Sequence, residues 1–291
     1  MLICASIVLY NPTDEIFQNI DSYVSFIDTL IVIDNSESIN QKIQDELYSR
    51  YTKVVYIGSN ENLGIATALN LACDKGIELG FEWILTMDQD SKFINFSDYT
   101  KCLLELDNKE EVAILGSNTM WHAADNLPAS PTCNHIEKFL VITSGNFLNL
   151  KLFNNIGRFE DKLFIDMVDH DYCMKAQQKK YKIYFYKDIL VEHSLGMLFQ
   201  RKNIFTGKIR NKIEHSPQRA YYITRNSFYL YKKYSKEFPE EFNLLKTLNI
   251  LFIHEITKIL IYEDKKREKI KAKFIGLYHA LSDQYGKYLL S

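Results

Sequence analysis

The sequence predicts an α/β fold in which helices cover both faces of a mostly parallel sheet, followed by a helical region at the carboxyl end. Strand and helix signals alternate through the first hundred residues. A β-α-β-α-β-α-β order implies parallel pairing, because parallel neighbours need a crossover connection. From Ser216 onward the chain has helical spacing. We therefore expect one domain over residues 1–215 and a helical region over residues 216–291.

The alternation can be followed element by element. The first strand is continuously apolar and is closed by Asn11 and Pro12. The expected strands of this part span residues 2–9, 29–33, 54–57 and 81–87. The expected helices span residues 13–26, 39–50 and 65–79. Polar residues follow the strands, so we expect them to collect at one edge of the sheet.

The middle of the chain is less regular. Residues 119–138 contain two prolines, Pro128 and Pro131, and are expected to form a loop. The stretch 139–150 is expected to form two strand segments with a break at Ser144 and Gly145. The other expected strands span residues 111–117, 182–186 and 189–192. The other expected helices span residues 96–107, 168–179, 217–235, 239–262 and 265–288.

Composition excludes several classes of protein. The chain has 291 residues, 46% of them apolar and 25% charged, which is typical of a globular protein. A net charge of −2 gives no global attraction to nucleic acid. The first ten residues lack a basic region and a cleavage site, so we expect them to form a buried strand rather than a secretory signal. No apolar run is long enough to span a membrane. The cysteines are odd in number, scattered and without zinc-ligand spacing, so we expect reduced thiols and a cytoplasmic protein. They are Cys4, Cys73, Cys102, Cys133 and Cys173.

Two carboxylates one residue apart close an apolar strand in the stretch Leu85–Ser91. Alternate residues of a strand point to the same side, so Asp88 and Asp90 are presented together at its end. Clustered hard oxygens suit Mg²⁺ or Mn²⁺, and such an ion typically also holds substrate phosphates. A solvated turn is the alternative interpretation, because this tripeptide pattern is common in loops.

The loops after the second and third strands are weaker candidates. Asp34 is able to accept a hydrogen bond from the N3–H of uracil or thymine, but a helix N-cap is the more common role for such a residue. The stretch from Asn60 to Gly64 would let the backbone approach a nucleotide closely. It is equally typical of a strand-to-helix turn.

Three acids flank a histidine in the second informative stretch, Phe164–Ala176. They stand at the start of a predicted helix, where the helix dipole favours acids whatever their function. A carboxylate there is also suited to act as a general base toward a hydroxyl. His193 ends a strand and is expected to face the diphosphate or the metal. Arg219 and Arg225 lie on one helix, six residues apart, so one is expected to reach phosphate while the other pairs with an acid.

Taken together, these residues resemble glycosyltransferase family 2, the inverting sugar transferases of the GT-A (nucleotide-diphospho-sugar transferase) fold. Within that family the chain most resembles the rhamnosyltransferase-like branch. The matching segments occur in the family's order and cover roughly residues 3–230. They span residues 7–12, 31–36, 61–66, 85–91, 143–145, 156–159, 163–169, 193–196 and 219–226. The helices from residue 238 onward match nothing in it.

The resemblance implies a role for each matching position. Asp169 is the expected catalytic base, although Val168 stands where many members have a glutamate, and Asp171, which aligns with a further acid, is the alternative. Asp34 is expected to bind the pyrimidine, Asp88 the ribose or the water shell of the metal, and Asp90 the metal itself. The expected nucleotide contacts are Asn11, Asp34, Asn62, Gly64, Asp88, Arg219 and Arg225. The expected sugar contacts are Ser144, Gly145 and Asp171. The expected metal ligands are Asp90, Asp88 and His193.

The resemblance also implies a reaction. The expected activity is inverting transfer of L-rhamnose from dTDP-β-L-rhamnose to a hydroxyl of a growing bacterial surface polysaccharide, with Mg²⁺ or Mn²⁺ as cofactor. The acceptor would be an oligosaccharide or a lipid-linked glycan, and a homo-oligomer is compatible with the sequence. The alternative donors are UDP-galactofuranose, UDP-glucose and UDP-galactose. A different class of function is a non-catalytic glycan- or nucleotide-binding protein.

The tail carries a basic amphipathic pattern on which the resemblance is silent. Apolar residues recur there at helical spacing beside a cluster of positive charges. The charges are Lys265, Lys266, Arg267, Lys269, Lys271 and Lys273. One interpretation is peripheral contact with the inner face of the cytoplasmic membrane. The other, which we favour, is that the apolar stripe Ile270, Phe274, Leu277, Tyr278 and Leu281 packs on the catalytic domain or on a second subunit.

Overall fold

The computed structural model describes residues 2–120, 131–193, 198–202, 207 and 209–290. Its chain divides into two compact units. The first consists of Met1–Glu160 and Val168–Ser194, and the second of Asp161–Met167 and Leu195–Ser291. The sequence placed the end of the first domain at residue 215. Pro128 of the expected loop and residues 194–196, which follow His193 in its matching segment, lie outside the described residues.

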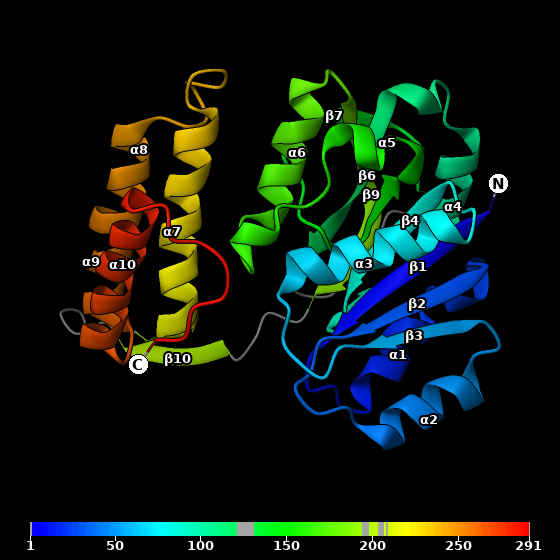
Figure 1. Cartoon of the computed structure of the whole chain (residues 1–291), viewed down its shortest axis with the longest axis horizontal. Helices are drawn as coiled ribbons and strands as arrows, with labels where there is room; N and C mark the ends of the chain where they lie inside the picture. Colours follow the sequence, from blue (N-terminus) through cyan, green and yellow to red (C-terminus); the bar gives the residue numbers. More distant parts are fainter. Residues whose placement is uncertain (1, 121–130, 194–197, 203–206, 208, 291) are drawn as a thin grey trace. The chain divides into compact units, whose positions relative to one another are not determined.

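The first unit is built on the predicted parallel strands. These are β1 (Ile3–Leu9), β2 (Thr29–Asp34), β3 (Val54–Gly58) and β4 (Trp83–Asp88). They lie in the order β3-β2-β1-β4, and each neighbouring pair is parallel (Figure 1). The connecting helices are α1 (Glu15–Asp21), α2 (Gln41–Arg50) and α3 (Ile65–Glu78). The predicted α/β fold with a mostly parallel sheet is therefore confirmed.

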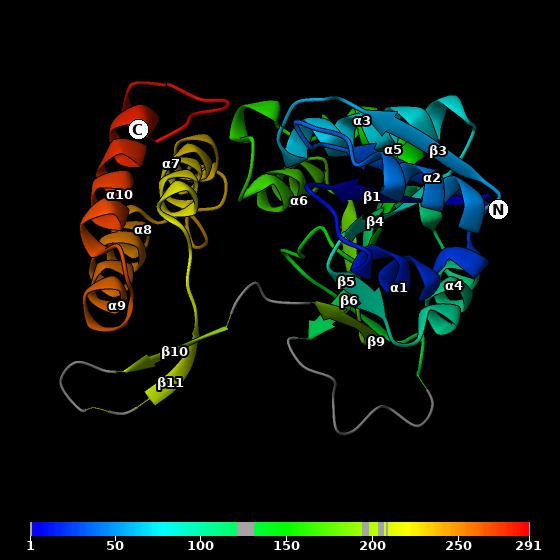
Figure 2. The ribbon, with the colours of Figure 1, turned by 90° about the horizontal axis from the view of Figure 1, so that it is seen from below.

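The sheet continues beyond β4 with mixed pairing. The additional strands are β5 (Ser91–Phe93), β6 (Val112–Met120), β7 (His135–Glu137), β8 (Asn146–Asn149) and β9 (Lys182–His193). The additional helices are α4 (Phe96–Glu105), α5 (Leu150–Ile156) and α6 (Val168–Gln178). Strand β8 is antiparallel to β4 and β6, whereas β6 and β9 are parallel. Helices α1 and α4 cover one face of the sheet, and α3, α5 and α6 cover the other (Figure 2).

Three local expectations were wrong in this part. Residues 139–145 form no strand, because the strand begins only at Asn146, after Gly145 with a φ of 82°. The two strands expected between residues 182 and 192 are one strand, β9, whose pairing with β6 is irregular after Tyr186. The expected loop at 119–138 contains the short strand β7, which pairs with β9.

The cysteine prediction was wrong for one pair. A disulfide joins Cys102 of α4 to Cys133, whereas Cys4, Cys73 and Cys173 are free and buried. Structural disulfides are rare in reducing compartments, so the cysteines no longer support the expectation of a cytoplasmic protein.

The second unit is mainly helical. It contains α7 (Pro217–Tyr234), α8 (Leu244–Leu248), the π-helical segment η4 (Asn249–His254), α9 (Glu255–Tyr262) and α10 (Lys266–Leu281). A hairpin of β10 (Leu198–Lys202) and β11 (Ile209–Ile213) precedes them. Helix α7 begins where Ser216 caps it, with Pro217 in the first turn. The helix expected to end at residue 288 ends at Leu281.

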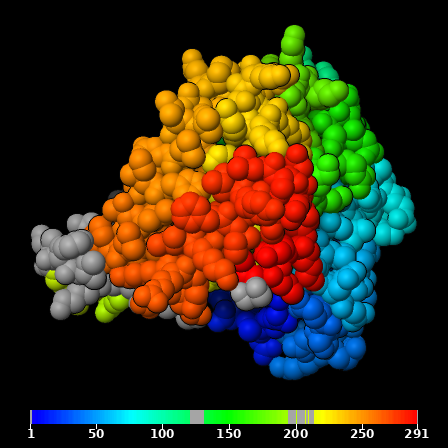
Figure 3. All heavy atoms as spheres, turned by 60° about the vertical axis from the view of Figure 1, so that its left-hand side comes forward, coloured from blue at the N-terminus to red at the C-terminus, as the bar shows by residue number. Residues whose placement is uncertain are grey.

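Helix α10 packs on α7 through small residues rather than through its apolar stripe. A side chain added at Gly276 would lie 2.6 Å from the carbonyl oxygen of Tyr221, so the two helix backbones approach closely. Ala272 and Ala280 are buried beside it, and the C-terminal segment lies against α7 through Gln218, whose side chain accepts from the backbone of Leu290. Figure 3 shows this segment in red beside α7 in yellow.

The surface of α10 weakens the membrane interpretation of the tail, and packing of the stripe on the catalytic domain or a second subunit stays a prediction. Phe274, Tyr278 and Leu281 are each more than half exposed, so the stripe is only partly covered. Lys269 and Lys273 are buried, and Lys269 is paired with Glu214 and Glu263. Two of the positive charges counted toward a membrane surface are thus unavailable to it. Among the described residues, no helix combines the length and apolarity that crossing a bilayer requires.

Candidate active site

The acidic pair at the end of β4 is joined by a histidine from a distant strand. Ligand atoms of Asp88, Asp90 and His193 all lie within 4.8 Å of one another. His193 ends β9, which pairs antiparallel with β5, so Ser91 lies opposite His193 in the register. The Nδ1 atom of His193 is 3.4 Å from the nearer carboxylate oxygen of Asp90. The structure thus brings together the three residues that the sequence assigned to metal.

A chain of hydroxyl groups ties this cluster to the Ser144–Gly145 turn. The Oγ atom of Ser91 is 2.6 Å from His193 Nδ1, and Ser144 Oγ donates to Ser91 Oγ over 2.9 Å. The backbone N–H of Asp88 donates to Ser144 Oγ over 3.1 Å. A side chain at position 145 would lie 2.5 Å from Ser117 Oγ, so only glycine fits there. The turn is therefore fixed against the end of β4.

Asp34 is fully buried and held in a fixed orientation at the end of β2. Its carboxylate accepts from the backbone N–H of Ser36 over 3.0 Å and from the Tyr56 hydroxyl over 2.5 Å. Burial and the hydrogen bond to Asp34 raise the pKa of Tyr56, so its hydroxyl stays protonated and donates. The interpretation of Asp34 as a helix cap is wrong, because Asn40 caps α2.

Two asparagines connect the loops after β2 and β3. The side chain of Asn62 accepts from Asn35 over 3.2 Å and from the backbone N–H of Gly64 over 3.0 Å. Asn35 accepts in turn from the backbone N–H of Leu63. Gly64 has a φ of 85° at the start of α3, a conformation that favours glycine. Together these contacts shape the loops at the carboxyl edge of the sheet.

The loop after β1 is hydrogen-bonded to the loop after β2 and to the acidic motif. The backbone N–H of Asn11 donates to Ser36 Oγ over 2.8 Å, and Asn11 itself has a φ of 48°. The side chain of Gln89 accepts from the backbone N–H of Tyr10 and donates to its carbonyl oxygen. The residue between the two aspartates therefore fixes the first loop against the acidic motif.

Asp169 lies in the first turn of α6 with 21% of its side chain exposed. One of its carboxylate oxygens accepts from the backbone N–H of His170 and lies 2.8 Å from the ring Nδ1 of the same histidine. Asp169 lines a small cavity together with Thr143, two residues before Gly145. A partly exposed carboxylate beside this turn has the accessibility that a general base needs.

Asp171 is in a different environment. Its side chain is fully buried and forms an ion pair of 2.8 Å with Lys175, one turn further along α6. A buried, paired carboxylate is a poor proton acceptor for a bound substrate. The geometry therefore favours Asp169 over Asp171 as the base and a structural role for Asp171.

The pair of Asp169 and His170 leads to a measurable expectation. Burial lowers the pKa of His170, but the hydrogen bond and charge of Asp169 outweigh it and raise this pKa above its usual value of 6.5. Protonated His170 therefore stabilises the fold below about pH 6.5, and this contribution is lost as the pH rises through the raised pKa. Asp169→Asn should lower the pKa of His170 below its value in the parent protein, because the effect of burial remains while the charge of Asp169 is lost.

NMR titration of the histidine ring signals measures this change. The signal of His279, whose pKa is lowered by burial and by Arg225, serves as the internal control and should keep its midpoint. An unchanged midpoint for His170 in the variant contradicts the arrangement described here.

The arginines of α7 have partners within the second unit. Arg219 forms an ion pair with Asp166, as expected for one of the two. Arg225 is fully buried, and its guanidinium donates to the carbonyl oxygens of Lys162, Leu163 and Gly286. These contacts favour a structural role for Arg225 instead of the expected nucleotide contact.

Sequence reasoning missed three residues of the candidate site. They are Ser91, Tyr56 and Gln89, which position His193, Asp34 and the first loop respectively. Ser91 and Gln89 belong to the acidic motif itself, so proximity in sequence was an available signal. Tyr56 lies on β3, and only the register of β2 against β3 brings it to Asp34.

Known proteins share this arrangement of elements. The mannosyltransferase PcManGT from Pyrobaculum calidifontis, in complex with GDP-Man and Mn²⁺, superposes with a TM-score of 0.58 at 11% identity over 96% of this chain and 75% of that chain. GalNAc-T7 with UDP, GalNAc and Mn²⁺ gives a TM-score of 0.57 at 11% identity over 86% of this chain. The chain has the GT-A fold of glycosyltransferases.

The GT-A fold also relates the chain to S. aureus TarS 1-349 in complex with UDP, with a TM-score of 0.52 and 13% identity over 100% of this chain and 94% of that one. The chain spans only 54% of GalNAc-T7 and 40% of a longer TarS chain. The sequence of this chain is 29% identical over 252 residues to that of the dTDP-rhamnosyl transferase RfbF of Shigella flexneri. The aligned region covers 79% of this chain and 80% of RfbF. No family model matches the sequence.

Proposed function

We propose that this protein is an inverting glycosyltransferase that transfers L-rhamnose from dTDP-β-L-rhamnose to a hydroxyl of a growing surface polysaccharide. The observation that carries the proposal is the convergence of Asp88, Asp90 and His193 beside the Ser144–Gly145 turn of a GT-A fold. The similarity to RfbF supports rhamnose as the sugar and dTDP as the nucleotide.

The acidic cluster fits a divalent cation. Two carboxylates and an imidazole within 4.8 Å form a compact, negatively charged set of oxygen and nitrogen ligands. Oxygen-rich sets suit Mg²⁺ and Mn²⁺. A bound cation would neutralise charge that develops on the leaving diphosphate. We infer that Asp90 and His193 are its ligands and that Asp88 contacts the cation, its water shell or the ribose of the donor.

The remaining steps belong to this chain's own side chains. Asp34, fixed by Ser36 and Tyr56, is placed to accept a hydrogen bond from the N3–H of the pyrimidine. Asp169 would take the proton of the acceptor hydroxyl while that oxygen attacks the anomeric carbon from the face opposite the diphosphate. One base is sufficient, because the reaction needs no covalent sugar–enzyme intermediate. The product of transfer from the β-linked donor would be an α-L-rhamnoside.

A donor screen tests this function. The purified protein is heated with Mn²⁺ and each of dTDP-rhamnose, UDP-galactofuranose, UDP-glucose and UDP-galactose, and the unfolding midpoint is recorded. The preferred donor should stabilise the fold by about 2.7 kcal/mol at a hundredfold excess over its Kd. If a UDP-sugar raises the unfolding midpoint more than dTDP-rhamnose does, that UDP-sugar is the donor instead. Donor binding without metal-dependent hydrolysis or transfer would indicate a non-catalytic binding protein.

A further inference from the structure

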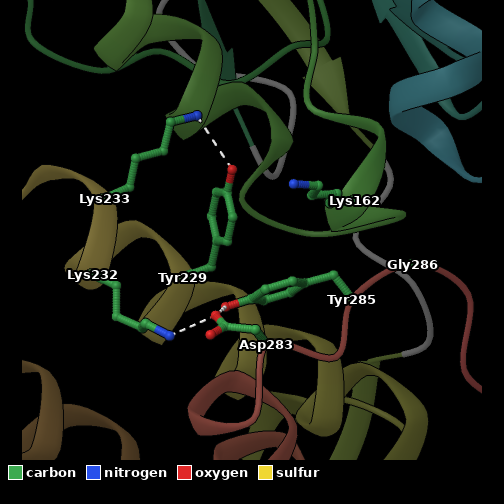
Figure 4. Close-up of a pocket in the computed structure, with 7 residues that line it drawn as sticks. All are labelled: Lys162, Tyr229, Lys232, Lys233, Asp283, Tyr285 and Gly286. Atoms are coloured by element: carbon green, nitrogen blue, oxygen red, sulfur yellow. Dashed lines mark hydrogen bonds and ion pairs between the residues drawn. The ribbon is translucent and has the colours of Figure 1, made fainter.

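The second unit contains a pocket whose lining residues have no assigned role in the proposed transfer chemistry. Its volume is about 580 Å³, within the range of small-molecule sites in proteins. It is lined by Lys162, Tyr229, Lys232, Lys233, Asp283, Tyr285 and Gly286 (Figure 4). These residues come from the segment 161–167, from α7 and from the chain after α10. Lys162 and Lys232 are exposed, so the pocket is open to solvent.

The charge of the pocket is positive. Three ammonium groups face one carboxylate, that of Asp283, which gives the lining a net charge of +2 (three minus one). Asp283 is paired with Lys232 at 2.6 Å, and this contact lowers the pKa of Asp283. The amino group of Lys162 points toward Tyr229 (Figure 4). A ligand that carries negative charge would therefore be attracted to the pocket.

Two tyrosines give the pocket apolar faces and polar tips. The rings of Tyr229 and Tyr285 meet edge to face, with centroids 5.0 Å apart. Lys233 lies 3.4 Å from the hydroxyl of Tyr229, and the hydroxyl of Tyr285 is 3.2 Å from Asp283. Tyrosine pairs of this kind offer flat surface for packing together with hydrogen-bonding groups at the rim. A sugar ring with both C–H faces and hydroxyl groups matches that combination.

The pocket is held in shape by backbone contacts. The N–H of Gly286 donates to the carbonyl oxygen of Lys162 over 2.8 Å, and buried Arg225 donates to the carbonyl oxygen of Gly286 over 2.7 Å. Arg225 and Asn226 both donate to the carbonyl oxygen of Leu163. The backbone that carries Lys162 and Tyr285 is therefore anchored to α7 before any ligand binds.

We propose that this pocket binds the acidic group of a saccharide, a carboxylate or a phosphate, and that it holds the acceptor glycan. The assignment to the acceptor rests on the proposed function. The pocket lies in the helical unit and contains none of the expected donor-site residues, whereas Asp34 and the metal cluster Asp88, Asp90 and His193 belong to the first unit. It is thus assembled from other residues than the donor site, as a separate acceptor subsite requires.

Binding is tested in the full-length protein without donor and with EDTA, so that the metal cluster does not contribute. The lysines are reductively methylated with ¹³C, which keeps their charge, and each signal is assigned from a Lys→Arg variant. The probes are methyl β-D-glucuronide, glucose 1-phosphate and, as neutral control, methyl β-D-glucoside. We expect saturable shifts of the Lys162 and Lys233 signals with at least one anionic probe and not with the glucoside.

Charge reversal then locates the site. Lys162→Glu and Lys233→Glu should each weaken binding of the anionic probe by at least about tenfold, or about 1.4 kcal/mol. Lys236→Glu is the matched control, because Lys236 is exposed in the same unit but does not line the pocket. Circular dichroism of each variant checks that it is folded.

Each result has a defined meaning. A response to the glucuronide alone identifies the acidic group as a carboxylate, and a response to the phosphate alone identifies a phosphate. No saturable response to either probe, equal binding of the neutral glucoside, or equal weakening by Lys236→Glu overturns the proposal. Because donor and metal are absent, this result is independent of the donor screen. The proposal for the pocket and the proposed transfer reaction are therefore tested separately.

Discussion

Asp90→Ala is expected to abolish the Mn²⁺-dependent part of nucleotide binding. The substitution removes the carboxylate that lies 3.4 Å from His193 in the acidic cluster. Loss of residues that merely support metal ligands typically costs 10- to 100-fold in metal affinity, so loss of a ligand should weaken dTDP binding by about a hundredfold or more. Isothermal titration calorimetry with dTDP, in Mn²⁺ and in EDTA, measures the effect.

A matched control separates this effect from general charge removal. Asp98 is a first-turn acid of α4 whose side chain contacts Lys101, away from the cluster. Asp98→Ala should bind dTDP with the parent's affinity in Mn²⁺. If Asp90→Ala also keeps that affinity, the assignment of the metal site to this cluster is wrong.

Asp169→Asn is expected to retain donor binding and to lose transfer. The change is nearly isosteric and removes the proton acceptor, a contribution of roughly 10²- to 10⁴-fold in rate. Single-turnover transfer from the donor identified by the screen, together with the calorimetric affinity for dTDP, separates chemistry from binding. Transfer at the parent's rate would exclude Asp169 as the base.

Asp171→Asn is the informative companion variant. Asp171 is buried against Lys175, so its substitution removes the nearer of the two carboxylates that pair with this largely buried lysine and should lower the unfolding midpoint. The folded fraction of this variant should still carry out transfer. If it is folded and inactive while Asp169→Asn is active, Asp171 is the base.

Much of the candidate site was predictable from local pattern. The pair Asp88 and Asp90 was assigned to metal because alternate residues of a strand point to the same side. Asp34 and Asn62 were placed at one edge of the sheet because both follow parallel strands, and the structure joins their loops through Asn35. The metal role of Asp88 and Asp90 stays a prediction, and Asp90 lies in the turn after β4 rather than on the strand. The placement of these residues at one edge of the sheet succeeded because it depends on the direction of parallel pairing.

Other features depend on contacts between distant segments. His193 meets Asp90 only because β9 runs antiparallel to the three-residue strand β5, which is too short for any pattern to reveal. The disulfide between Cys102 and Cys133 likewise joins residues whose spacing gives no signal. Burial of Lys269 and Lys273 on α10 contradicts the usual preference of lysine for solvent, and only the acids around Lys269 explain its place.

The sequence by itself determined the parallel half of the sheet, its connecting helices and the acidic motif at the end of β4, because short-range periodicity and strand direction specify these features. The tertiary structure alone decided that Arg225 is buried and that segment 161–167 belongs with the helices. It also decided that Lys162 and Tyr285 share a pocket. The physical reason is that the hydrogen bonds from Arg225 and Asn226 to backbone carbonyls about 60 residues away have no local signature.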